Sequence, residues 1–178
     1  MPQNVGIRRL LSGDAPTIAS AFQALGWSKT VAQYERYARE DAQGLRTCFV
    51  AESEGQFAGY CTLLWESKYP GFRDANIPEV SDLNVLPSFR NRGIGSRLLD
   101  AVEAVAAERC AVVGLGVGLY SDYGAAQRLY VRRGYVPDGG GIMYDNSPVE
   151  PGSEIRIDDD ATLMLVHSLG GTSVITPG

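Results

Sequence analysis

The passage that most constrains this chain runs from VSDLNVL, residues 80–86, through FRNRGIGSRLL into a run of regularly spaced apolar residues. The first part predicts a strand whose side chains alternate between two faces. The run after it places apolar residues on one face of a helix, at Ile94, Leu98, Leu99, Val102, Val105 and Ala106. Between strand and helix stand Gly93 and Gly95. Glycine in a first helical turn costs about 1 kcal/mol relative to alanine, so two of them indicate a requirement other than helix formation.

A strand followed by a glycine-rich turn and a helix is an arrangement that binds anions. The first backbone N–H groups of a helix lack partners within the helix, and the helix dipole places partial positive charge there. Side chains at positions 93 and 95 would block a ligand lying against those amides, and Arg90, Arg92 and Arg97 add positive charge. We therefore expect a ligand with closely spaced phosphates. The phosphate-loop pattern GxxxxGK(S/T) is absent, and an ordinary helix start with solvated arginines is the alternative.

The rest of the chain mixes strands and helices. Strands are predicted at 5–10, on both sides of an acidic turn at 54–55, at 111–120, and twice in the last third around a long polar connection at 138–160. Helices are predicted at 13–27, 30–44 and 123–135, and a loop at 68–79. This order predicts one mixed α/β domain with a central sheet over residues 1–168, followed by a flexible tail at 169–178.

Composition excludes several classes of function. The 178 residues carry a net charge of −5, which argues against nucleic-acid binding because that binding depends on neutralising phosphates. His167 is the single histidine, so a histidine-rich metal site is excluded and no metal is predicted. Cys48, Cys61 and Cys110 form no CxxC pair, and we expect buried reduced thiols. No apolar run approaches the roughly 20 residues of a membrane span and no signal-peptide pattern is present, so we expect a cytoplasmic protein.

Two segments, taken together, resemble a known family. The segment NVLPSFRNRGIGSRLLDAVEAVA is similar to the acetyl-CoA-binding segment of the GNAT N-acetyltransferase superfamily, whose signature is Q/R-x-x-G-x-G/A. Further along the chain, GAAQRLYVRRGYVP resembles the family element AxxLYxxxGF. The resemblance covers residues 5–168. It implies an α/β GNAT fold, with a central, mostly antiparallel sheet of about six to seven strands, splayed between the fourth and fifth strands and flanked by about four helices.

The resemblance also implies that acetyl-CoA is the acyl-donor cosubstrate, and it indicates where the donor would bind. The pyrophosphate would lie against the backbone of Arg90, Asn91, Arg92, Gly93, Ile94, Gly95 and Ser96. The pantetheine arm would pair like an extra strand with Leu83, Asn84 and Val85. A splayed strand that leaves a cleft for this arm would suit the glycines at 114, 116 and 118.

The chemistry of the family needs a proton acceptor and a proton donor. A primary amine with a pKa near ~10.4 is about 99.9% protonated at neutral pH, so a base must take a proton before the amine attacks. Glu79 and Asp82 are the candidate bases, and the use of no single base is the third alternative. Tyr130 matches the family tyrosine assigned as proton donor to the leaving thiolate, although it could instead pack on an apolar helix face. Tyr123 stands where the family often has a cofactor-contacting asparagine.

We expect the acceptor to be an amine of a small molecule or of a peptide. Four aromatic residues on segments that vary in the family could wall its pocket: Trp27, Tyr69, Phe72 and Tyr144. Asp158 belongs to an acidic group, with Glu154 and residues 159–160, that could attract a cationic amine or simply be solvated. A non-catalytic acyl-CoA-binding sensor domain is the alternative function, and a homodimer would be in keeping with the family.

Overall fold

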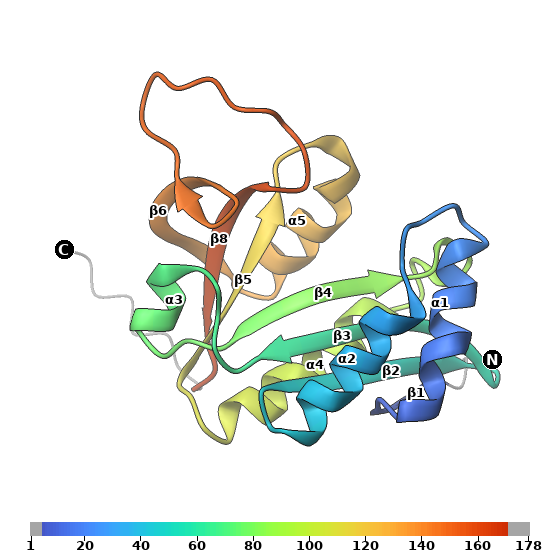
Figure 1. Ribbon diagram of the computed structural model, residues 1–178. Helices are drawn as coiled ribbons and strands as arrows, with labels where there is room; N and C mark the ends of the chain where they lie inside the picture. The colour runs from blue at the N-terminus through green and yellow to red at the C-terminus, as the bar shows by residue number, and fades with distance from the viewer. Residues whose placement is uncertain (1–4, 171–178) are drawn as a thin grey trace. The chain divides into compact units, whose positions relative to one another are not determined.

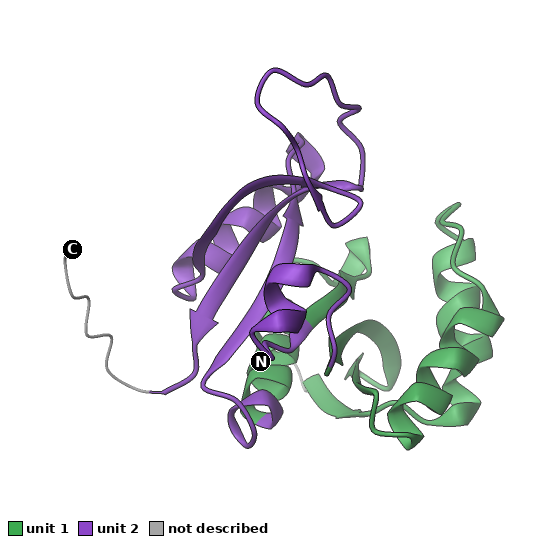
Figure 2. Ribbon diagram, turned by 60° about the vertical axis from the view of Figure 1, so that its left-hand side comes forward, with its two compact units in different colours: residues 1–65, 80–104 green, residues 66–79, 105–178 purple. Residues whose placement is uncertain are grey.

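The computed structural model describes residues 5–170, which fold as two compact units (Figure 2). Unit 1 comprises Met1–Trp65 and Val80–Ala104, and unit 2 comprises Glu66–Glu79 and Val105–Gly178. The chain therefore passes from one unit to the other at three points, and the segment that carries the Gly93 turn belongs to unit 1.

Unit 1 is built on four strands in the order β1-β2-β3-β4. They are β1 (Val5–Arg9), β2 (Arg46–Ser53), β3 (Gln56–Leu64) and β4 (Glu79–Val85). β1 pairs with β2, and β2 with β3, in antiparallel register. The β2–β3 hairpin closes at Glu54 and Gly55, whose φ angles of 53° and 76° are the left-handed values that a two-residue hairpin turn requires.

Helices cover both faces of these strands (Figure 1). The helical segments are η1 (Ser12–Asp14), α1 (Ala15–Gln23), α2 (Val31–Ala42), η2 (Pro87–Phe89) and α4 (Ile94–Ala107), whose last turn falls in unit 2. α1 and α2 pack against each other and against β2 and β3, and α4 runs along the opposite face. α2 begins where Thr30 Oγ1 accepts a hydrogen bond from the N–H of Gln33 (3.2 Å), a regular N-cap.

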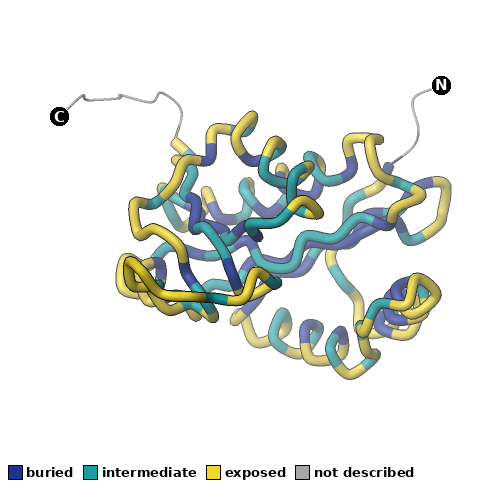
Figure 3. Tube along the Cα trace, turned by 90° about the horizontal axis from the view of Figure 1, so that it is seen from above, coloured by how far each residue is buried: buried dark blue, intermediate teal, exposed yellow. Residues whose placement is uncertain are grey.

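Apolar burial follows the spacing that the sequence shows. Residues on the inward faces of α1, α2 and the strands form one buried cluster: Ala15, Ile18, Ala19, Phe22, Tyr34, Tyr37, Cys48, Val50, Tyr60 and Leu86. On α4, Ile94, Leu98, Leu99, Val102 and Ala106 are each at most 1% exposed, which confirms the predicted helical face. Along the helices, buried residues alternate with exposed ones, whereas β2 and β3 are buried over most of their length (Figure 3).

Unit 2 is built on strands in the order β5-β8-β6-β7. They are β5 (Val112–Gly118), β6 (Val136–Tyr144), β7 (Ser147–Pro148) and β8 (Ala161–Ser168), and their pairings are antiparallel. The helical segments are α3 (Pro70–Asp74), η3 (Ser121–Tyr123) and α5 (Gly124–Arg132). β5 pairs with β8 along the whole length of β5, from Val112 opposite Ser168 to Gly118 opposite Thr162.

Large side chains pack directly against the backbone of β5 at its glycines. A Cβ at Gly114 would overlap the ring of Phe72, one at Gly118 would overlap the ring of Tyr123, and one at Gly116 would lie 3.1 Å from the sulfur of Met164. Packing within unit 2 therefore accounts for these glycines, without the splayed strand that we expected them to serve.

The mixed α/β fold class is as predicted, with small differences in count. Residues 5–170 contain eight strands and five α-helices, against about six to seven strands and four helices expected. The predicted loop at 68–79 contains α3, which Pro70 begins at a first-turn position. The predicted connection at 138–160 is shorter than expected, because β6 continues to Tyr144 and the two-residue strand β7 follows it. The splay between the fourth and fifth strands, and the single domain over 1–168, stay predictions.

Other expectations concern the tail, the cysteines and membranes. The N–H of Leu169 donates to the carbonyl of Ala111 (2.8 Å), so this first residue of the predicted tail is tied to unit 2; residues 171–178 of that tail lie outside the described part of the chain. Cys48 and Cys61 are buried free thiols as predicted, whereas Cys110 is partly exposed. Between residues 5 and 170, the structure has no helix with the length and apolar character of a membrane span.

Candidate active site

The turn that precedes α4 has the conformation and the open space that a ligand cradle needs. Gly93 has a φ of +75°, which disfavours any side chain, and nothing lies within 4 Å of where its Cβ would be. Asn91 is also left-handed, with a φ of +59°. Arg90, Asn91, Arg92 and Gly93 are exposed, whereas Ile94 is 1% exposed and fixes the first turn of the helix in the core. A Cβ at position 93 would therefore fill space that is open beside a helix start.

The three arginines near this turn are all exposed, but their contacts differ. Arg90 Nε donates to the carbonyl of Val85 (3.3 Å), and the guanidinium of Arg92 lies 5.3 Å from the ring centroid of Phe89. Arg97 donates instead to the carbonyl of Val5 (2.9 Å), which ties α4 to β1. Arg90 and Arg92 thus contact residues next to the turn, whereas Arg97 links α4 to β1.

The predicted pantetheine-binding residues Leu83, Asn84 and Val85 form the end of β4 and are half-buried. At Gly59 on β3, a Cβ would lie 2.5 Å from the carbonyl oxygen of Asn84, so the two backbones approach closely there. The strand continues into η2 with a hydrogen bond from the N–H of Leu86 to the carbonyl of Ala58 (2.9 Å). This close approach fixes the position of the β4 backbone.

Asp82, the second candidate base, lies at the centre of a polar group that we call the Asp82 cluster. Five side chains donate to its carboxylate: Lys29 (3.0 Å), Gln33 (3.3 Å), Tyr37 (2.8 Å), Tyr60 (2.7 Å) and Asn84 (2.8 Å). Lys29 is the cation of this cluster, and the Asp82 side chain is 18% exposed. These donors occupy both carboxylate oxygens.

The charges around Asp82 hold it ionised. Burial opposes the charged form, but the positive charge of Lys29 and the hydrogen bonds from Tyr60, Lys29 and Tyr37 outweigh burial, so the pKa of the Asp82 carboxyl lies below its ordinary value. Burial and the charge of Asp82 conversely raise the pKa of Tyr37 to about 12. A carboxylate with a lowered pKa and five donors is a weak proton acceptor, so this geometry argues against Asp82 as the base.

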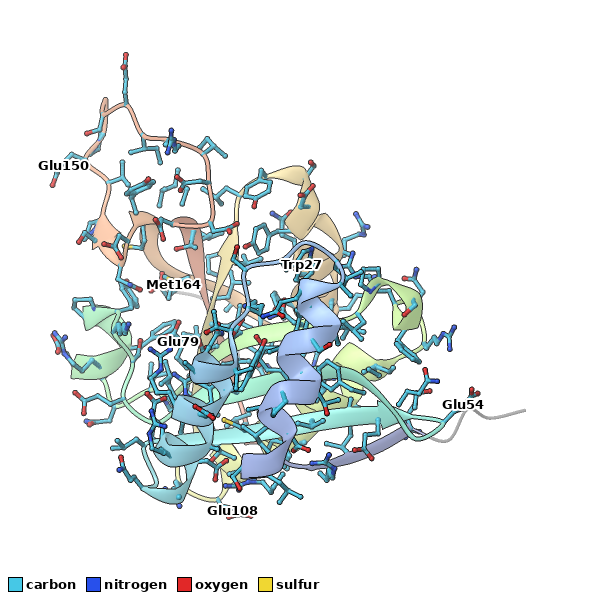
Figure 4. All side chains as sticks on the ribbon, turned by 45° about the vertical axis from the view of Figure 1, so that its right-hand side comes forward. Trp27, Glu54, Glu79, Glu108, Glu150 and Met164 are labelled. Atoms are coloured by element: carbon cyan, nitrogen blue, oxygen red, sulfur yellow. The ribbon has the colours of Figure 1, made fainter. Side chains whose placement is uncertain are left out.

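Glu79, the first candidate base, begins β4 and has a different setting (Figure 4). Ser67 Oγ donates to Glu79 Oε2 (2.5 Å) and at the same time accepts from the N–H of Tyr69 (3.0 Å). Ser67 is 2% exposed, so its hydroxyl is held in place and presents its proton to the carboxylate. Glu79 is half-buried. A buried neutral donor, Ser67, therefore helps to orient this carboxylate.

Tyr130, the candidate acid, lies on the buried face of α5 and is 7% exposed. Its ring packs against Tyr135, with centroids 5.7 Å apart, and Tyr135 stacks in turn on His167 at 4.9 Å. The N–H of Tyr135 also donates to the Tyr130 carbonyl (3.0 Å). Both residues and His167 thus form an aromatic stack within unit 2, which gives Tyr130 a packing role whatever its chemistry.

The aromatic residues proposed as pocket walls divide into two groups. Phe72 is 1% exposed and Tyr69 is 6% exposed, and both belong to a buried cluster with Met143 and Met164. The Tyr69 hydroxyl also donates to Asp138 (2.9 Å). This burial argues against Tyr69 and Phe72 as walls of an acceptor pocket, and their role at such a pocket stays a prediction. Trp27 is half-buried and stacks on Phe22 at 5.3 Å, at the end of α1 (Figure 4).

The acidic group near β8 is held by tyrosines. The hydroxyls of Tyr120 and Tyr123 both donate to Asp159, and that of Tyr144 donates to Asp158 (3.1 Å). The guanidinium of Arg156 lies 3.9 Å from Asp158. These contacts fasten the segment before β8, and they show that Asp158 and Asp159 are partnered rather than simply solvated.

The sequence alone did not identify the partners of the two carboxylates. Lys29 and Tyr37 could have been found, because an acidic residue inside a strand needs a cation and donors, and the chain has two lysines. No signal in the sequence pointed to Ser67, which lies at the end of a predicted strand, directly before the predicted loop at 68–79.

A family model and a curated protein both match this chain. The model of the acetyltransferase (GNAT) family matches residues 15–135. An uncharacterized N-acetyltransferase, YhfO of Bacillus subtilis, is 28% identical over 157 residues, covering 79% of this chain and 95% of that protein.

Solved structures share the fold. The acetyltransferase yncA of Salmonella typhimurium, determined with its cofactor acetyl-CoA, has a TM-score of 0.68 at 18% identity and covers 97% of this chain and 98% of its own. A ribosomal-protein-alanine N-acetyltransferase from Brucella melitensis has a TM-score of 0.68 at 21% identity and covers 92% of this chain and 99% of its own.

Proposed function

Since the chain belongs to the acetyltransferase (GNAT) family and is an acetyltransferase, we propose that it moves the acetyl group of acetyl-CoA to an amine by direct attack in a ternary complex. The turn at Gly93 carries this assignment, because its left-handed φ and its open space suit a ligand that lies against the backbone. The comparisons lend no support to the alternative of a non-catalytic acyl-CoA sensor.

We assign donor binding to residues of unit 1. The backbone from Arg90 to Ser96 would hold the pyrophosphate of acetyl-CoA, with the exposed guanidiniums of Arg90 and Arg92 adding charge. The backbone of Leu83, Asn84 and Val85 would hold the pantetheine arm. The bound coenzyme supplies a thioester, whose carbonyl carbon an amine can attack. A backbone N–H near Val85 would stabilise negative charge on the acetyl oxygen.

We assign proton transfer to residues 79 and 130. Glu79 would accept a proton from the acceptor ammonium, directly or through water, with its carboxylate held by Ser67. Tyr130 would donate a hydrogen bond toward the leaving thiolate. Full proton transfer from a phenol of pKa ~10 to a thiolate of thiol pKa ~8.5 is uphill by about 2 kcal/mol, so a hydrogen bond is the more economical role.

The acceptor proposed is an amine of a small molecule or of a peptide. The Brucella relative is named for alanine acetylation on ribosomal protein, which makes a peptide with N-terminal alanine a reasonable probe. Trp27 could contact an acceptor because it is half-buried, and Asp158 could attract a cationic one. The cytoplasmic location and a homodimer stay predictions.

Thiol release from acetyl-CoA, measured with a panel of spermidine, n-butylamine and an alanine-terminated peptide, tests this function. We expect release above the rate of hydrolysis with at least one amine. Glu79→Gln should then lower kcat/KM about 100-fold, whereas the matched exposed variant Glu66→Gln should leave it unchanged. Acetyl-CoA binding without release for any amine would favour the sensor, and an unchanged rate in Glu79→Gln would exclude Glu79 as the base.

A further inference from the structure

Asp82 has a backbone conformation that a strand does not normally contain. Within β4 its φ is +61°, the left-handed region, which non-glycine residues rarely adopt. Such residues in strands mark irregularities that redirect the chain, and they persist only where surrounding contacts hold them. The irregularity comes directly before Leu83, the first of the three residues assigned to the pantetheine arm. The direction in which β4 presents its backbone therefore depends on what holds Asp82.

The contacts that hold Asp82 come from several elements of unit 1. Lys29 reaches it from the turn between α1 and α2, Gln33 and Tyr37 from α2, Tyr60 from β3, and Asn84 from β4 itself. Asn84 Nδ2 also donates to the hydroxyl of Tyr60 (3.2 Å), which closes the network around the carboxylate. Four of the five donors belong to other elements than β4, so contacts from outside the strand help to hold its left-handed backbone.

Lys29 supplies the positive charge that balances the carboxylate of Asp82. Its Nζ lies 3.0 Å from Asp82 Oδ1, and the two side chains are 22% and 18% exposed. Removing one partner of a mostly buried ion pair leaves the other charge uncompensated, which disfavours the arrangement that contains it. Without Lys29 the carboxylate would gain by turning toward water, and the strand would lose the conformation that the carboxylate holds.

We propose that Asp82 and Lys29 are positioning residues for acyl transfer: together they hold the irregular turn of β4 that presents residues 83–85 to the pantetheine arm of the donor. The inference rests on the proposed function, since it assumes that the arm binds there. In this role Asp82 transfers no proton. The turn between α1 and α2 contributes to donor binding through Lys29.

Two ligands separate this role from a general loss of stability. Acetyl-CoA would meet both the Gly93 turn and β4, whereas 3′-phospho-ADP, the nucleotide half of the coenzyme, would meet the turn alone. Calorimetric titration of each ligand into Lys29→Met should show acetyl-CoA binding weakened about tenfold and 3′-phospho-ADP binding unchanged within about twofold. Lys29→Arg keeps the charge and should restore most of the acetyl-CoA affinity.

Matched variants keep the test informative. Arg9→Met removes an ion pair between β1 and Asp41 of α2 that does not touch Asp82, and it should leave both affinities unchanged. Tyr37→Phe removes one donor and no charge, so it should fold even if Lys29→Met fails to fold. It should weaken the binding of acetyl-CoA about threefold and leave the binding of 3′-phospho-ADP unchanged.

Equal weakening of both ligands, or no change in either, would overturn the positioning role. Failure of the unaltered protein to bind either ligand would instead overturn the proposed function, and the positioning role would fall with it.

Discussion

Two glycine-rich regions of this chain look alike in sequence and differ in structure. The turn at Gly93 in unit 1 has a positive φ and no atom within 4 Å of the missing Cβ. Gly114 and Gly118 of β5 in unit 2 have ordinary φ angles, but a Cβ at either would overlap an aromatic ring, Phe72 or Tyr123. Gly93 is required by its backbone conformation, and the space beside it is open. Gly114 and Gly118 are required because aromatic rings occupy the space that a Cβ would take.

We interpret the difference as one between a proposed ligand site and positions where glycine makes room for the protein's own side chains. An open, left-handed glycine beside a helix start can accept an anion, and substituting it affects binding more than folding. A glycine under a buried ring contributes to packing, and substituting it affects folding first. Each of the following substitutions tests this distinction through a free energy of unfolding, from the largest expected effect to the smallest.

Gly59→Ala should be the most destabilising. Its Cβ would lie 2.5 Å from the carbonyl oxygen of Asn84 and 3.1 Å from Cα of Val85, and backbone atoms cannot move aside as side chains can. We expect a loss of about 3 kcal/mol in the free energy of unfolding, measured by urea titration. A loss below about 1 kcal/mol would show that β3 and β4 can separate at no great cost.

Gly114→Ala should cost about 2 kcal/mol, because the Phe72 ring is buried yet can shift. The double variant Gly114→Ala/Phe72→Leu should recover part of that loss relative to Phe72→Leu alone, since the smaller side chain leaves room for the methyl group. Strict additivity of the two changes in the same urea titrations would contradict the packing explanation.

Gly93→Ala and Gly55→Ala should each cost only about 1 kcal/mol. The two glycines share nearly the same φ, +75° and +76°, and both have open space around the missing Cβ, so backbone strain is the common cost. Thermal unfolding should give nearly equal shifts for the pair. A much larger loss in Gly93→Ala would indicate that this turn has a packing role as well.

The sequence predicted elements better than it predicted contacts. Apolar spacing placed α4, and the acidic turn at Glu54–Gly55 placed the β2–β3 hairpin, because both signals are local. The helix α3 was missed because its five residues, with Pro70 and Gly71, carry no periodicity. Phe72 was expected to wall an acceptor pocket, because nothing in its own segment shows that its ring packs against Gly114 of β5.

The same limit applies to the candidate site. The Gly93 turn could be recognised because conformation and charge are concentrated in a short segment. The two carboxylates could not be told apart, because Asp82 and Glu79 are distinguished only by partners distant along the chain, Lys29 and Tyr60 for one and Ser67 for the other.

The most direct measurement is a calorimetric titration of acetyl-CoA into the unaltered protein, Gly93→Glu and Gly55→Glu. Both variants place the same residue on a left-handed, open backbone position, so their melting temperatures should be similar. A glutamate at 93 would fill the cradle and repel phosphates, and we expect acetyl-CoA affinity to fall at least about 100-fold in Gly93→Glu alone. Equal affinity in the two variants would contradict the assignment of the Gly93 turn as the donor site.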